Sequence, residues 1–175
     1  WNQPTTGSGQ TVRHLVPALV EQEPSLQIVL VVPQWVASKA GVLPQRVSLH
    51  TVSCRGDNLG KLWFEQVMFP RVSRRFGADL AHVPYFASPL NPSVPTLVTI
   101  HDLIPIVLPQ YRGNVLTRLY TSLVAVAASR AHLVLTDSRA SQRDILARLP
   151  IPPNRVRVVY LAPAPHYCPV DDAGA

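Results

Sequence analysis

Two hydrophobic periods alternate along the 175-residue chain, one typical of amphipathic helices and one typical of buried strands. Apolar residues recur every three or four positions within residues 8–22, which predicts a helix there, although Pro17 either kinks that helix or counts against it. The run IVLVV at residues 28–32 is continuously apolar, which is the pattern of a strand covered on both faces.

The alternation continues to the end of the chain. Further strands are predicted at residues 46–52, 80–85, 96–100, 132–136 and 155–160. Further helices are predicted at residues 60–76, 116–127 and 138–149, the first of them weakened at Pro70. Strands that alternate with helices predict the α/β class, with a Rossmann-like, doubly wound, mainly parallel sheet in a single domain over residues 1–175.

Composition narrows the class of protein. A hydrophobic content of 47% and a mean hydropathy of +0.13 favour a globular domain over a disordered chain. No apolar run reaches the roughly 18 residues that a membrane span requires. Cys54 and Cys168 have neither metal-binding nor redox spacing, and no signal peptide is visible in WNQPTTGSGQ, so we expect reduced thiols in a cytoplasmic protein.

The net charge of +6 suits phosphate-bearing ligands, an anionic membrane or nucleic acid. The arginines that carry most of this charge are scattered, and their tightest cluster is RVSRRF at residues 71–76. We interpret this cluster as a solvated helix end in preference to a nucleic-acid patch, because cations suit that end of the helix dipole. Aromatic residues do not interleave with the basic ones as they do in single-strand binders.

Polar side chains directly follow two of the predicted strands. His101 and Asp102 come after TLVTI, and Asp137 and Ser138 come after HLVLT. Open parallel sheets bind ligands beyond the carboxyl ends of their strands, so a functional role for His101 is as credible as a structural one. Asp102 either orients His101 or caps the turn that follows. For Asp137 and Ser138 we favour an N-cap of the next helix over a ligand contact.

Gly7, Ser8 and Gly9 open the first predicted helix. Glycines allow close approach of the backbone to a ligand, and a helix N-terminus attracts an anion. The dinucleotide fingerprint G-x-G-x-x-G is broken, because Val12 stands where the third glycine belongs. A strand is expected to feed this loop, yet only four residues precede Thr5 in the sequence.

The ordered set of segments resembles a known family. GSGQTVRHLVPAL is followed by HVPYFASPLNP, by LVTIHDLIPIVLPQY, by LVLTDSRASQRDIL and by NRVRVVYLAP. Together they resemble the amino-terminal domain of group 1 glycosyltransferases, which are retaining sugar transferases of the GT-B fold. The resemblance covers nearly the whole chain, and TIHD and TDSRASQRDI carry most of it.

The resemblance implies an acceptor-side domain whose partner is a carboxy-terminal domain that binds a nucleotide-sugar donor through basic residues and a glutamate pair. The chain shows no such pair, since its glutamates are Glu21, Glu23 and Glu65, and the fold's first strand, near the middle of the sheet, is also missing. We therefore expect this chain alone to be inactive without its second domain. The acceptor is expected to be a saccharide or a lipid-linked sugar, with peripheral contact at the inner face of a membrane.

The resemblance also implies roles for individual residues. His101 would face the donor sugar across the cleft as a catalytic residue, with Asp102 beside it in the same motif. Gly7, Ser8 and Gly9 would lie close to the donor phosphates and the acceptor, and Ser138 would contact substrate. Arg139 departs from the glutamate that the family commonly places there. No cofactor, metal or nucleic-acid partner is implied.

Two other classes of function stay open from the residues alone. One is a nucleotide- or dinucleotide-binding module of ordinary Rossmann type, against which stand the broken fingerprint and the absence of an acidic residue after IVLVV. The other is a non-catalytic binding or scaffold domain that uses the arginines.

Overall fold

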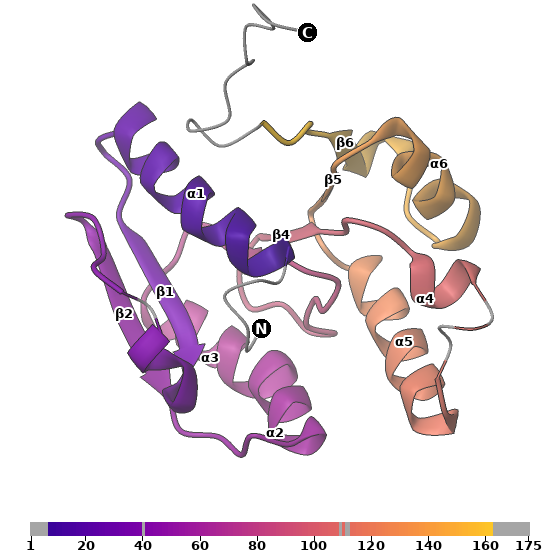
Figure 1. Cartoon of the computed structure of the whole chain (residues 1–175), viewed down its shortest axis with the longest axis horizontal. Helices are drawn as coiled ribbons and strands as arrows, with labels where there is room; N and C mark the ends of the chain where they lie inside the picture. The colour runs from indigo at the N-terminus through magenta and orange to yellow at the C-terminus, as the bar shows by residue number, and fades with distance from the viewer. Residues whose placement is uncertain (1–6, 40, 109, 111–112, 163–175) are drawn as a thin grey trace, which may run out of the picture.

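The computed structural model describes residues 7–39, 41–108, 110 and 113–162 (Figure 1). All of its paired strands are parallel, and they form two sheets. The first sheet contains β1 (Ile28–Pro33) and β2 (Val47–Val52). The second contains, in spatial order, β3 (Ala81–Val83), β4 (Thr96–Thr99), β5 (Leu133–Thr136) and β6 (Val156–Val158). The predicted α/β class with parallel strands is confirmed.

Helices connect the strands. The α-helices are α1 (Gly7–Gln22), α2 (Asn58–Trp63), α3 (Phe69–Arg75), α4 (Ile104–Val107), α5 (Val115–Ala128) and α6 (Arg139–Arg148). Short 3-10 turns are η1 (Gln34–Lys39) and η4 (Pro153–Arg155), and a π-helical turn, η2, spans Phe64–Met68. In Figure 1, α1 crosses in front of the space between β1 and β4, while α4, α5 and α6 lie on the side away from β1 and β2.

The helix predicted over residues 60–76 is confirmed in its extent, since residues 58–75 are helical, but it is not regular throughout. It begins at Asn58, because the Asp57 carboxylate accepts a hydrogen bond from the Gly60 N–H at 2.8 Å. The π-helical turn η2 then separates α2 from α3, and Pro70 falls in the first turn of α3. The proline directly follows the π-helical turn, in which the Phe69 N–H donates to the Phe64 carbonyl.

The main core lies around β4 and β5. Val98, Ile100 and Val134 are completely buried, and Ile145 of α6 and Ala128 of α5 pack against them. The four strands of this sheet are shorter than predicted, because each contains only three or four residues. The predicted ranges are 80–85, 96–100, 132–136 and 155–160. After β3 the next residue is Pro84, which has no N–H to donate to a ladder.

The strand predicted at residues 28–32 is confirmed as β1, but its predicted cover on both faces is wrong. Ile28–Val32 are only partly buried, and within the described residues β1 pairs with β2 alone. The predicted single sheet is therefore interrupted between β1 and β3.

Helix α5 also differs from its prediction. Leu116 and Leu119 belong to the apolar pattern that predicts this helix, yet they are 74% and 62% exposed, whereas Val124, Ala127 and Ala128 are buried. Small residues allow the last turns of α5 to approach the sheet closely, so these turns supply the buried face. Among the residues described, no helix is both long and apolar enough to cross a membrane.

Candidate active site at the edge of the four-stranded sheet

His101 and Asp137 meet at the carboxyl edge of the four-stranded sheet. The parallel register of β4 and β5 pairs Thr99 with Leu135, and the Ile100 N–H donates to the Leu135 carbonyl at 2.8 Å. The residues that follow are thereby brought together, with His101 Nδ1 2.6 Å from Asp137 Oδ2. Because a carboxylate only accepts, Nδ1 carries the hydrogen and donates it.

The other ring nitrogen of His101 faces the end of a third strand. Nε2 lies 3.3 Å from the carbonyl oxygen of Pro84, which directly follows β3. When both nitrogens carry hydrogen, the ring satisfies both acceptors; when Nε2 is deprotonated, it can accept from a hydroxyl. The side chains of His101 and Asp137 are 25% and 22% exposed, so the pair is accessible to a ligand and still held by its neighbours. The arrangement can exchange a proton or hydrogen-bond a polar substrate.

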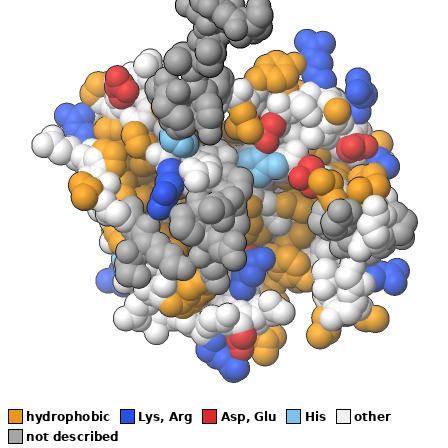
Figure 2. Space-filling view, viewed as in Figure 1, with side chains coloured by type: hydrophobic (Ala, Val, Ile, Leu, Met, Phe, Trp, Pro, Cys, Tyr) orange, Lys and Arg blue, Asp and Glu red, His pale blue; other side chains and the backbone are white. Residues whose placement is uncertain are grey.

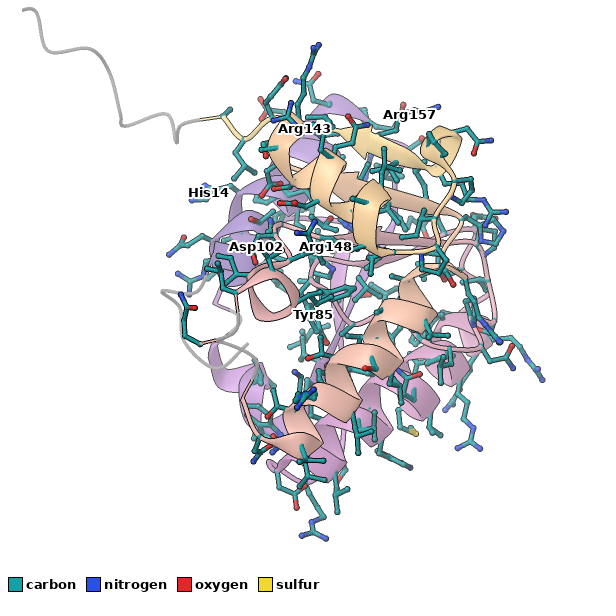
Figure 3. The ribbon with its side chains drawn as sticks, turned by 90° about the vertical axis from the view of Figure 1, so that its right-hand side faces the viewer. His14, Tyr85, Asp102, Arg143, Arg148 and Arg157 are labelled. Atoms are coloured by element: carbon teal, nitrogen blue, oxygen red, sulfur yellow. The ribbon has the colours of Figure 1, made fainter. Side chains whose placement is uncertain are left out.

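Asp102 serves a local role in the structure. Its Oδ1 accepts a hydrogen bond from the Ile104 N–H at 2.9 Å, at the start of α4. Of the two roles weighed for Asp102, the structure therefore supports the cap. Figure 3 places Asp102 and Tyr85 close to α4, while Arg143 and Arg157 lie at a separate end of the view.

The N-cap prediction is confirmed for Ser138 and wrong for Asp137. Ser138 Oγ accepts from the Ser141 N–H and donates to the Ser141 hydroxyl, each at 3.0 Å, and so caps α6. Asp137 instead holds His101. The signal that could have found Asp137 is its place directly after the strand that neighbours β4, but the neighbour relation depends on the order of strands in the sheet.

Gly7, Ser8 and Gly9 form the first turn of α1, as the sequence predicts. Figure 1 shows the amino-terminal end of α1 in front of β4. The residues that precede this turn lie outside those described. The first turn of this 16-residue helix carries the positive end of its dipole.

His82 is a second histidine near the pair, and its ring contacts the neighbouring strand. Its Nε2 lies 2.8 Å from the Thr99 hydroxyl, within the β3–β4 ladder. Burial, and to a smaller extent the charge of His101, lower the pKa of His82 below its usual range. His82 is thus held neutral, and His101 is the histidine at this edge that faces a carboxylate.

A pocket of about 330 Å³ lies at the carboxyl ends of β1 and β2, and Tyr85, shortly after β3, contributes to its lining. Its lining includes Pro33, Trp35, Cys54, Arg55, Asp57, Lys61, Phe64 and Tyr85. Tyr85 follows Pro84 in the chain, so the pocket wall is one residue away from the carbonyl that His101 contacts. Sequence reasoning missed this pocket because its residues have no common spacing.

Two further features of the site bear on its chemistry. Cys54 is a free thiol, and Cys168 lies outside the described residues. In the described part of the chain, no three side chains of His, Cys, Asp or Glu converge on a point that could hold a metal ion. Figure 2 shows Lys and Arg side chains dispersed over the visible face, as the scattered arginines of the sequence suggest.

Comparison with known proteins adds one finding. The sequence model described as Glycosyltransferase Family 4 matches residues 5–162, which is most of the chain. A search of curated proteins found no match. The family match confirms the coarser part of the resemblance drawn from the sequence.

Proposed function

Because the chain belongs to glycosyltransferase family 4, we propose that it is the acceptor-side domain of a group 1, retaining glycosyltransferase with the GT-B fold. This enzyme transfers a hexose-like sugar from a nucleotide-sugar donor to an acceptor. The observation that supports the proposal best is the His101–Asp137 pair, held at 2.6 Å at the edge of the sheet where ligands bind.

The mechanism assigns His101 to the transferred sugar. Retaining transfer develops positive charge on the sugar while a nucleoside diphosphate departs. Asp137 fixes the ring and its tautomer through Nδ1, so that Nε2 is the nitrogen free to exchange its Pro84 contact for a substrate hydroxyl. The amino-terminal turn of α1, with Gly7 and Gly9, stabilises the departing diphosphate through backbone N–H groups and the helix dipole.

In this proposal Ser8, in the first turn of α1, contacts substrate, and Asp102 and Ser138 order the backbone near the pair. Asp102 orders the backbone after His101, and Ser138 orders the backbone after Asp137, through their caps. No metal is assigned, and a carboxy-terminal domain would hold most of the donor. On this proposal the chain alone binds nucleotide-sugar weakly and transfers little.

The acceptor is proposed to be a saccharide or a lipid-linked sugar, reached from the cytoplasmic side of a membrane. The net charge of +6 would attract an anionic lipid surface. Leu116 and Leu119, exposed on α5 beside Arg118, give that contact an apolar element. Nucleic acid is not among the proposed partners.

Replacement of His101 tests the function. In the enzyme that carries this domain with its donor domain, we expect His101→Ala to lower sugar transfer by roughly 10²–10⁴-fold, because a positioned acid–base or hydrogen-bonding group is lost. Transfer is measured with radiolabelled UDP-glucose and GDP-mannose, and thermal unfolding reports the fold. His50→Ala is the matched control, since His50 lies on β2 against the Phe76 ring. Wild-type turnover in His101→Ala would contradict the proposal.

A further inference from the structure

Glu65 is a buried carboxylate that the chemistry proposed for His101 does not use. Its exposed fraction is 2%, and it lies in the π-helical turn η2, a rare conformation that is frequent at functional sites. Burial raises its pKa, against the opposing effects of the Lys61 ammonium group and of two tyrosine hydroxyls. A buried carboxylate costs free energy unless its partners replace the lost water, so its partners show what it holds in place.

The partners of Glu65 come from two different parts of the fold. Tyr85, shortly after β3, donates its hydroxyl hydrogen to Oε1 at 3.0 Å. Tyr120 of α5 donates to Oε2 at 2.8 Å. Lys61, one helical turn before Glu65, places Nζ 3.7 Å from Oε1 and 4.7 Å from the ring centre of Tyr120. The carboxylate therefore ties both the segment after β3 and helix α5 to the same turn.

The hydrogen bond to Tyr85 reaches His101 through a single peptide group. The Pro84 carbonyl oxygen, 3.3 Å from His101 Nε2, belongs to the peptide group that joins Pro84 to Tyr85. That group is planar, so the direction of the carbonyl depends on ψ of Pro84 and φ of Tyr85. The pyrrolidine ring already restricts φ of Pro84. A Tyr85 side chain that is held by Glu65 restricts the other end of the same peptide group.

The rest of the loop after β3 is held by the next residue of η2. The Gln66 side-chain amide donates to the Ser88 carbonyl at 3.1 Å, and its oxygen accepts from the Leu90 N–H at 2.8 Å. Two consecutive side chains of the turn, Glu65 and Gln66, thus bind the loop at Tyr85 and further along. Because both belong to one turn, the loop is fixed to η2 as a unit.

We propose that Glu65 is a positioning residue for His101. It acts through the Tyr85 hydroxyl, which fixes the peptide group whose carbonyl faces Nε2. The inference rests on the proposed transfer function and adds a residue to its machinery. Asp137 holds Nδ1 on one side of the ring, and the Pro84 carbonyl faces Nε2 on the other. Acceptors at both nitrogens keep the ring in one orientation until a substrate hydroxyl replaces the carbonyl, and reaction chemistry needs such fixed geometry.

Two phenylalanine substitutions give a matched pair, because each removes one phenol hydroxyl from the same carboxylate and keeps the ring. Tyr85→Phe releases the peptide group beside His101, whereas Tyr120→Phe releases only the contact with α5. Heteronuclear NMR of the 175-residue chain records the imidazole resonances of His101, which are assigned by their absence in His101→Ala. We expect Tyr85→Phe to shift these resonances and Tyr120→Phe to leave them in place, although both lower the melting temperature.

Substitution of Glu65 itself tests the route of the effect. Glu65→Leu keeps the Tyr85 hydroxyl but removes its acceptor, so it should shift the His101 resonances as Tyr85→Phe does. Adding Tyr85→Phe to Glu65→Leu should then give no further shift, because both changes break the same link. Glu65→Gln should keep the native resonances, since an amide can bond a phenol through its oxygen or its NH2 group. If Glu65→Leu does not fold, the two phenylalanine variants decide.

Kinetics of the complete enzyme add a second measurement. Tyr85→Phe should lower kcat by about tenfold or more with little change in KM, the scale for losing a partner that orients a functional group. Tyr120→Phe should leave kcat near its native value. Unmoved His101 resonances in Tyr85→Phe would overturn the inference, as would equal shifts in Tyr85→Phe and Tyr120→Phe. A rise in KM alone would also overturn it, because the hydroxyl would then bind substrate instead.

The same data separate this inference from the proposed function. Resonance shifts in Tyr85→Phe and Glu65→Leu but not in Tyr120→Phe, together with no transfer by the complete enzyme, would keep the positioning of His101 and reject the transferase mechanism. Transfer that depends on His101, with native His101 resonances in Tyr85→Phe, would do the reverse.

Discussion

The four-stranded sheet and the two-stranded sheet are built from similarly apolar strands, but they are buried to different degrees. Val98 of β4 and Val134 of β5 are completely buried, whereas Val29 and Val31 of β1 are only partly buried. Strands β4 and β5 each pair on both sides, while β1 pairs on one. Apolar composition alone therefore does not bury a strand, because its two faces must also be covered.

Under the proposed function, the two sheets would have different tasks. The well-packed sheet holds His101 against Asp137, and the proposed chemistry needs such fixed geometry. The less buried strands β1 and β2 are followed by Trp35, Arg55 and Asp57, which line a pocket. The following predictions test this division, from the largest expected effect to the smallest.

A matched pair of isoleucines tests the difference in packing. Ile100→Ala should lower the free energy of unfolding by about 2–5 kcal/mol, because it removes a fully buried side chain and leaves a cavity. Ile28→Ala in β1 should cost about 1 kcal/mol, since that side chain is already partly exposed. Urea unfolding measures both. Equal losses of stability in the two variants would contradict the difference in packing. Two separate unfolding transitions would show that the two sheets unfold independently.

A matched pair of aspartates tests the difference in function. Asp137→Asn should lower kcat by roughly a hundredfold, because the neutral amide removes the charge beside His101 and its NH2 can donate to Nδ1, which favours the other tautomer. Asp57→Asn should instead leave kcat nearly unchanged, since Asp57 caps α2 and pairs with Arg55, and asparagine can also cap a helix. Steady-state kinetics of the complete enzyme give kcat for both variants. A fall in kcat for both variants would contradict the division.

Amide hydrogen exchange compares the backbones directly. Amides of β4 and β5 should exchange about a hundredfold more slowly than those of β1, because only the former lie between two paired neighbours. Exchange of the native chain followed by mass spectrometry of peptides reports each strand. Comparable protection in all three strands would show that the open edge of β1 is covered in solution.

The smallest effect is a difference in pH dependence. The lowered pKa of His82 means that its stability contribution is present above pH 6.5 and is lost as the pH falls through its folded value. The raised pKa of Glu65 means that its contribution is present below pH 4.5 and is lost as the pH rises through its folded value. Acidification from pH 7 to pH 5 should therefore cost His82→Gln less stability than the unchanged chain, and cost Glu65→Gln more. Urea unfolding at the two pH values decides the signs, and a reversed order would exclude these assignments.

One residue of the candidate pair could be predicted from the sequence, and the other could not. His101 could be placed at a sheet edge because TLVTI is a buried-type strand that ends directly before it. Asp137 could not be identified as its partner, since two caps were equally plausible for the residues after HLVLT. The partner depends on β4 and β5 being neighbours in register, and strand order is not a local property.

Local pattern determined the types of the elements in this protein, because hydrophobic periods of two and of about 3.6 arise within a few residues. It also determined the order of strands and helices and the family resemblance, which are both linear in the chain. Only the tertiary structure decided that Asp137 holds His101, that Leu116 and Leu119 are exposed, and that Glu65 gathers Lys61, Tyr85 and Tyr120. These facts depend on contacts between residues as far apart as Glu65 and Tyr120, and such contacts are fixed by how whole elements pack.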